Sequence, residues 1–287
     1  CRWFMLVDMS NPALPAILAR GLTRLFPGGH GVSELDLNVP AGSIYGFLGP
    51  NGAGQTTTIR LLLGLLRPQE GRIELFGEPL PQALRLVGAL VESPSLYGHL
   101  SGRENLEVTR RLLGAPRARI DAVLQRVDLA GHADRRVGEY SLGMRQRLAI
   151  ALALLGAPRL LVLDEPSNGL DPAGIVDLRC LLRSLADEGI TVFVSSHLLG
   201  EIEQIATHVG VLRDGRLRFE GRLEELRGRV RPRLHVRCEP LVRAVGVLER
   251  LGESVISMDE GSLVLELGIR EEAEINRLLV ENGIAVS

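Results

Sequence analysis

The sequence contains no lysine, so all 33 of its basic residues are arginine. Lysine is among the commonest residues of soluble proteins, and its absence therefore indicates a bias that acts on the whole chain. Where a motif calls for lysine, the same bias can have removed it. The loss of lysine from a single motif is then weak evidence for a site that is inactive by design.

Cysteines and long apolar runs are also scarce. Cys1, Cys180 and Cys238 are odd in number and widely spaced, which favours reduced thiols over a disulfide framework. The longest apolar runs, such as 148–157, have about half of the roughly 20 residues that a membrane-spanning helix needs. We expect no segment of this sequence to cross a membrane.

The chain also lacks a strong charge of one sign. It carries 33 basic and 35 acidic residues, for a net charge of −2, and no block of like charge forms a basic tail. Nucleic acid is therefore not an expected partner. A length of 287 residues with 45% hydrophobic content allows one large or two ordinary domains with real cores.

A glycine-rich loop lies between an apolar run of strand length, 44–48, and a predicted helix, 58–63. The loop consists of Gly49, Pro50, Asn51, Gly52, Ala53, Gly54, Gln55, Thr56 and Thr57. A strand, such a loop and a helix in this order form a phosphate-binding P-loop. We expect all three glycines to adopt positive φ and to bring backbone N–H groups close to a phosphate chain. Thr56 would place its hydroxyl on Mg²⁺.

Gln55 occupies the position at which the P-loop motif has lysine. The loop has thus lost the side-chain cation that reaches the β- and γ-phosphates. Such a loss can cost about 10²–10³ in rate, so we predict weakened ATP binding and slow hydrolysis. A module that dimerises on ATP with little or no hydrolysis is the alternative.

Two segments, 160–163 and 191–194, are apolar except for Thr191, and each is followed by polar residues. Continuous apolarity is typical of strands buried on both faces of a parallel sheet, whose carboxyl ends meet beside the phosphate loop. After the first segment, Asp164 would hold Mg²⁺ and Glu165 would orient and polarise the attacking water. After the second, His197 could hydrogen-bond a γ-phosphate.

Ser141 and Gly143 belong to a short motif, 141–145, that precedes the apolar helix 148–155. By itself this motif is only a capped helix start. Together with the preceding motifs, which occur in the expected order, it makes the chain from 16 to about 227 resemble the nucleotide-binding subunit of an ABC transporter.

This resemblance implies roles for further residues. In the family, the segment 141–145 is the signature motif, which contacts the γ-phosphate held by the P-loop of a second copy. Asp171 matches the D-loop, and Phe26 is placed like the aromatic residue that stacks on adenine. Glu92 stands where most relatives have the Q-loop glutamine that touches Mg²⁺ and the permease.

The resemblance also implies a head-to-tail homodimer that sandwiches two ATP molecules. Separate transmembrane permease subunits would complete the transporter at the cytoplasmic face of a bacterial membrane. The sequence of 91–100 and the C-terminal extension look closest to those of drug- and peptide-resistance exporters, including those for bacitracin or lantibiotics. A soluble ABC protein of DNA repair or translation is disfavoured, because the chain has neither a long coiled coil nor a second ATP cassette.

We expect an α/β fold with three regions. Residues 1–15 form an N-terminal extension, and 16–227 an ABC domain with a parallel core sheet, an antiparallel β subdomain and a helical subdomain at about 93–157. Residues 228–287 are expected to begin with an arginine-rich linker, 228–232, and to form a small α+β domain. Its predicted βαββαβ order is ferredoxin-like, and it contains no catalytic constellation.

Overall fold

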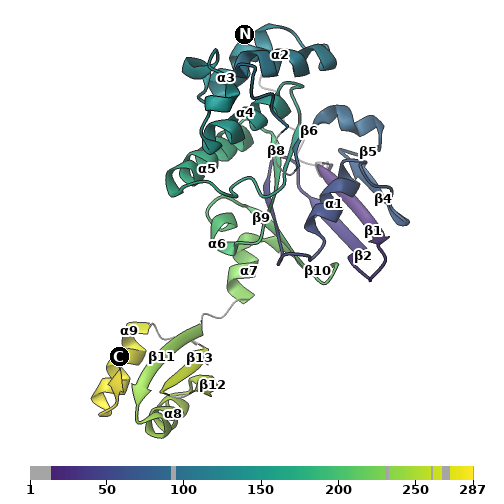
Figure 1. Cartoon of the computed structure of the whole chain (residues 1–287). Helices are drawn as coiled ribbons and strands as arrows, with labels where there is room; N and C mark the ends of the chain where they lie inside the picture. The colour runs from purple at the N-terminus through teal and green to yellow at the C-terminus, as the bar shows by residue number, and fades with distance from the viewer. Residues whose placement is uncertain (1–13, 92–94, 230–232, 260, 267–271, 287) are drawn as a thin grey trace, which may run out of the picture. The chain divides into compact units, whose positions relative to one another are not determined.

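The computed structural model describes residues 14–91, 95–229, 233–259, 261–266 and 272–286. The chain divides into two compact units, of which the first extends to Leu223 and the second begins at Glu224 (Figure 1). The division falls at the start of helix α7 (Leu223–Arg229), slightly before the predicted boundary. Most of the predicted N-terminal extension lies outside the described residues.

A six-stranded sheet with the order β10-β9-β3-β8-β7-β6 lies at the centre of the first unit. Its strands are β3 (Ile44–Leu48), β6 (Val87–Leu90), β7 (Leu160–Leu163), β8 (Thr191–Ser196), β9 (His208–Arg213) and β10 (Arg216–Arg222). Neighbouring strands are parallel except β10, which pairs with β9 in the antiparallel sense. Every residue of β3, β7 and β8 is buried, which confirms the predicted α/β core.

A second sheet of the same unit is antiparallel and has the order β2-β1-β4-β5. Its strands are β1 (Ile17–Leu25), β2 (Gly31–Val39), β4 (Glu70–Leu75) and β5 (Glu78–Pro79). From Leu35 to Val39, buried and exposed residues alternate along β2, which is typical of a strand with one face on the core and one in solvent. The buried side chains share a hydrophobic core with Phe47 of β3 and Ile59 of the helix after the P-loop.

The helices α2, α3 and α4 gather beside one another, apart from β1, β2 and β4 (Figure 1). The helices of this unit are α1 (Gln55–Leu62), α2 (Gly102–Leu113), α3 (Ala118–Arg126), α4 (Leu142–Leu154), α5 (Pro172–Asp187) and α6 (Leu199–Ile202), with short 3₁₀ turns at Gln82–Leu86, Ala130–His132 and Val137–Glu139. A capping box opens α2. The Ser101 hydroxyl accepts from the backbone N–H of Glu104, and the Glu104 carboxylate accepts from that of Ser101.

The second unit alternates strands and helices in the predicted βαββαβ order. Its elements are β11 (Arg233–Glu239), α8 (Leu241–Arg250), β12 (Ser254–Asp259), β13 (Ser262–Glu266), α9 (Glu272–Glu281) and β14 (Ala285–Val286). The sheet order is β12-β13-β11-β14, with antiparallel pairing throughout. Side chains from both helices, such as Leu248 and Leu279, share one core with Val236 and Leu265 of the sheet.

Candidate functional site

The P-loop leaves β3 after Leu48 and enters α1 at Gln55, as predicted. Gly54 has a φ of 108° and lies so close to β2 that a Cβ atom would stand 2.8 Å from the Gly31 carbonyl oxygen. Gly52 also has a positive φ, of 81°. The prediction for Gly49 was wrong, because its φ is not positive. Glycine is needed there for space, since a Cβ would lie 2.7 Å from the Leu212 carbonyl oxygen.

The Gln55 side chain is turned inward and is only 8% exposed. Its Nε2 donates to the backbone carbonyl oxygens of Phe47 at 2.7 Å and Ser196 at 3.0 Å. The amide thus ties together the ends of β3 and β8. If it swung out to reach a phosphate, both carbonyls would lose this donor, while the Ser196 carbonyl would keep the backbone N–H of Gly49 at 3.4 Å. Each hydrogen bond lost in this way costs about 0.5–1.5 kcal/mol.

Thr56 and Asp164 face each other across the start of α1. The Thr56 hydroxyl donates to Asp164 Oδ2 at 3.1 Å, and the Ser195 hydroxyl donates to Asp164 Oδ1 at 2.6 Å. A hydroxyl and a carboxylate in contact are hard oxygen ligands, and Mg²⁺ in nucleotide sites takes one or two such protein ligands beside phosphate and water oxygens. The residues present therefore fit a magnesium ion.

Ser195 was missed by sequence reasoning. Its hydroxyl also accepts from the backbone N–H of Glu165 at 2.9 Å, so it orients both carboxylate residues. The only signal in the sequence is that Ser195 is the first polar residue after the apolar run 191–194.

Glu165 has a φ of 47°, in the left-handed region that residues with a Cβ rarely adopt. Such a conformation costs about 1–2 kcal/mol and persists where surrounding bonds impose it. Both carboxylate oxygens lie 3.1 Å from Nδ1 of His197. The structure thus pairs the two predicted catalytic side chains with each other.

A hollow of about 310 Å³ beside these residues, here named the P-loop hollow, combines apolar, polar and acidic groups. It is lined by Phe26, His30, Gly31, Asn51, Gly52, Gly54, Gln55, Thr56, Thr57, Asp164 and Glu165. Arg24 lies over the Phe26 ring, 5.2 Å from its centroid. His30 was not singled out in the sequence, although it follows Phe26 in the same turn. Pro50 and Ala53 shape the loop, with the Ala53 N–H donating to the Pro50 carbonyl at 3.0 Å.

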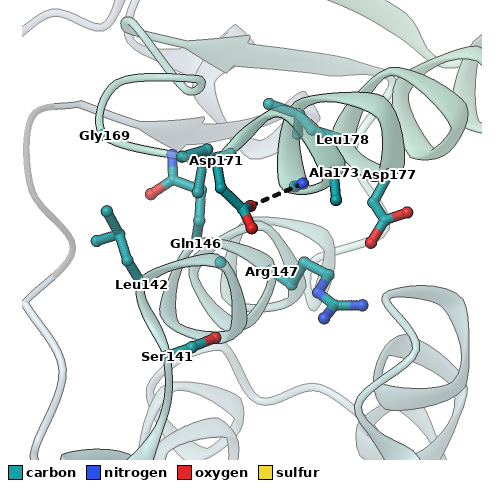
Figure 2. A pocket seen from close by; sticks show the side chains of 12 residues that line it. Ser141, Leu142, Gln146, Arg147, Gly169, Asp171, Ala173, Asp177 and Leu178 are labelled. Atoms are coloured by element: carbon teal, nitrogen blue, oxygen red, sulfur yellow. Dashed lines mark hydrogen bonds between the residues drawn. The ribbon is translucent and has the colours of Figure 1, made fainter.

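The structure places Ser141, Gly143 and Asp171 in a different hollow, of about 360 Å³, between α4 and α5 (Figure 2). We name it the α4–α5 hollow. Ser141 Oγ accepts from the Met144 N–H at 3.2 Å, and Asp171 Oδ1 accepts from the Gly174 N–H at 2.9 Å. Each residue therefore caps the N-terminus of its helix. Among the described residues, the linings of the two hollows share none.

Glu92, the remaining predicted metal ligand, lies outside the described residues. No group of three or more His, Cys, Asp or Glu side chains within the described ranges could hold a metal by itself. In the same ranges, no helix is long and apolar enough to span a membrane.

Comparison with known proteins decides the family. The family model described as ABC transporter matches residues 32–168. The bacitracin transport ATP-binding protein BcrA of Bacillus licheniformis is 44% identical over 274 residues, covering 92% of this chain and 89% of that protein. The chain belongs to the ABC transporter family. This confirms the resemblance drawn from the motifs.

Other ABC relatives agree. The lantibiotic transport ATP-binding protein SrtF of Streptococcus pyogenes is 40% identical over 190 residues, covering 66% of this chain and 83% of that protein. Among solved structures, cbiO1 of Clostridium perfringens, part of the ABC transporter complex cbiONQ, has a TM-score of 0.69 at 26% identity. That alignment covers 83% of this chain and 96% of cbiO1. The chain is therefore homologous to ATP-binding subunits of transporters for bacitracin and lantibiotics.

Proposed function

We propose that this chain binds and hydrolyses ATP in the P-loop hollow to power export through a separate permease, with a drug or antimicrobial peptide as cargo. The observation that carries the proposal is the contact of Thr56 with Asp164, with Glu165 next in the chain and the P-loop beside them. The relatives that transport bacitracin and lantibiotics support the class of cargo.

Groups in and beside the hollow divide the reaction among them. The Phe26 ring would stack on adenine, while backbone N–H groups of the loop between Asn51 and Thr57 would hold the phosphates. Thr56 and Asp164 would hold Mg²⁺, which neutralises charge on the phosphate oxygens. Glu165 would accept a proton from the attacking water. The oxygen of that water would bond to the γ-phosphorus as the bond from phosphorus to the leaving ADP oxygen breaks. His197 would hold Glu165 and contact the γ-phosphate.

A homodimer would supply the missing half of the site. Ser141, Gly143 and Asp171 line a hollow of their own, so we propose that they contact the nucleotide held by the P-loop of a second copy. Donors at the helix N-terminus behind Ser141 suit a γ-phosphate. Permease subunits would bind this dimer at the cytoplasmic face of the membrane, much as cbiO1 is part of a transporter complex.

Gln55 would slow the reaction rather than abolish binding. Its neutral amide already donates to two carbonyls, so it offers the phosphates neither charge nor a free donor. The alternative is a module that closes as a dimer on ATP and hardly hydrolyses it. For residues 228–287 we propose the ferredoxin-like fold, supported by the order β12-β13-β11-β14.

Phosphate release from Mg·ATP by the purified chain, beside Gln55→Lys and Glu165→Gln, tests the proposal. Gln55→Lys should raise the rate by about 10²-fold, because it restores a cation at the transferring phosphoryl group. Glu165→Gln should abolish release. If none of the three proteins releases phosphate while ATP still drives dimerisation, the chain is the alternative, a module that closes as a dimer with little hydrolysis. If the unchanged chain is fast and Gln55→Lys adds nothing, the assigned cost of Gln55 is wrong.

A further inference from the structure

Glu201, on the short helix α6, contacts the two segments that follow β7 and β8. Its Oε2 accepts from the Ser167 hydroxyl at 2.5 Å and, over a longer distance of 3.5 Å, from the Ser196 hydroxyl. Ser167 stands two residues after Glu165, and Ser196 immediately precedes His197. Glu201 is thus hydrogen-bonded to chain neighbours of both members of the proposed catalytic pair, Glu165 and His197.

These contacts close a ring. From Glu165 the chain leads to Ser167, whose hydrogen bond leads to Glu201 and on to Ser196. The chain then reaches His197, whose ring returns to Glu165 at 3.1 Å. A displacement anywhere in such a ring is passed to the Glu165–His197 contact, because each remaining link is a hydrogen bond or a stretch of only one or two peptide units.

Packing alone does not set the spacing of the two segments. The pairing of β7 with β8 ends before them, and a small cavity of about 20 Å³ is lined by Pro166 and Ser167 of one segment and Ser195 and Ser196 of the other. A void lacks the close contacts that would hold its walls apart at a fixed distance. The carboxylate of Glu201 bridges this gap.

The segment that carries Glu201 is itself anchored. The Arg183 guanidinium on α5 donates to the Gln204 carbonyl just beyond α6. Ile202 is buried against β3, so closely that a Cβ on Gly46 would lie 2.1 Å from its Cγ2. Glu201 is therefore held to the core sheet from one side and to α5 from the other, and it can act as a fixed point for the ring.

We propose that Glu201 is a positioning residue that sets Glu165 and His197 relative to each other for ATP hydrolysis. This inference rests on the proposed function. Within the described residues, Glu201 does not line the P-loop hollow, and its carboxylate is engaged by the hydroxyls of Ser167 and Ser196, so we assign it no contact with the nucleotide. Its loss should therefore slow the chemical step and leave nucleotide binding nearly unchanged.

Phosphate release by Glu201→Ala, Glu201→Gln and Ser167→Ala tests this in the chain and in its Gln55→Lys variant. A misplaced catalytic group can cost about 10²-fold, so we expect kcat of Glu201→Ala to fall about 10- to 100-fold with KM changed less than about threefold. Glu201→Gln should recover most of the rate, because its amide oxygen still accepts from Ser167. Gln204→Ala, at an exposed neighbouring side chain, is the matched control.

The ring NMR signal of His197, assigned with His197→Gln, gives a readout that does not need turnover. Glu201→Ala should move it in the same direction as Glu165→Gln does, since both disturb one contact. An unmoved signal, or a fall in rate that Glu201→Gln shares in full, overturns the inference. If Glu165→Gln retains full hydrolysis, the proposed function fails instead, and the His197 signal still decides the role of Glu201.

Discussion

The P-loop hollow and the α4–α5 hollow lie in one unit of the chain but differ in chemistry. The first combines a glycine loop with Asp164 and Glu165, and the contact of Thr56 with Asp164 fits a magnesium ion. The second is lined by the N-terminal ends of two helices, which Ser141 and Asp171 cap (Figure 2). Backbone N–H groups that can bind phosphate are available in both hollows. Among the described residues, the contacting hydroxyl and carboxylate that fit a metal ion, Thr56 and Asp164, belong to the first. The difference supports a site assembled from unlike halves of two copies.

Mixing two inactive variants tests whether the two hollows complete one site, and it has the largest expected effect. Ser141→Arg and Asp164→Asn should each lower phosphate release by about 10²-fold or more, because each spoils one half of every site. A mixed dimer keeps one intact site of two, so random mixing should restore about a quarter of the parent rate. The rate of the mixture, in the Gln55→Lys background if needed, is the measurement.

Mixing two samples of the same variant is the control and should restore nothing. If Ser141→Arg and Asp164→Asn both fold and bind ATP, yet their mixture stays inactive, the two hollows do not complete each other. A head-to-tail dimer would then have to be abandoned.

Gln55→Ala is expected to have the next largest effect, on stability. It removes the two hydrogen bonds from Nε2 to the carbonyls of Phe47 and Ser196, at a cost of about 1–3 kcal/mol in the free energy of unfolding. Urea unfolding measures it. Gln55→Lys should lower the free energy of unfolding by less than Gln55→Ala does, because an ammonium group can donate to both carbonyls.

Gln146→Ala provides the matched change in the other hollow. Gln146 lines the α4–α5 hollow, and its truncation should cost less than about 1 kcal/mol. Equal losses from Gln55→Ala and Gln146→Ala would show that the two carbonyl contacts of Gln55 contribute nothing particular.

The smallest expected effect concerns acid stability of the helical part that carries Ser141. Hydrogen bonds from Arg110 and Arg111 lower the pKa of Glu107 from 4.5 to about 2. A carboxylate whose pKa is lowered by folding stabilises the fold above its ordinary pKa. This contribution is lost as the pH falls from about 4.5 to about 2. Glu107→Gln should flatten the acid-unfolding profile over this window, measured by far-UV circular dichroism.

Glu107 is partly exposed to solvent, with 24% of its side chain accessible, and the pair is screened by water, so this change should be small. Glu70→Gln, at an exposed position on β4, is the control and should leave the profile as it is. Identical acid profiles for Glu107→Gln and the parent chain would contradict the role assigned to the two arginines.

Local patterns predicted much of the site. The P-loop between β3 and α1, the carboxylates after β7 and the capping box of Ser101 each depend on residues close together in the sequence. One partner of Gln55 and one of Asp164 do not. Ser196 is 141 residues from Gln55, and Ser195 is 31 residues from Asp164. No periodicity or spacing in a single sequence encodes which carbonyl or hydroxyl arrives at such a distance.

By itself, the sequence determined the order of strands and helices, the glycine loop and the chemistry available at the strand ends. Hydrophobic pattern and backbone freedom are local properties, and they act wherever the residues occur. Only the tertiary structure decided that Gln55 faces two carbonyls, that Gly49 is needed for space and that Glu165 pairs with His197. It also placed Ser141 and Asp171 in a hollow apart from the P-loop, because sheet order and helix packing alone bring distant segments together.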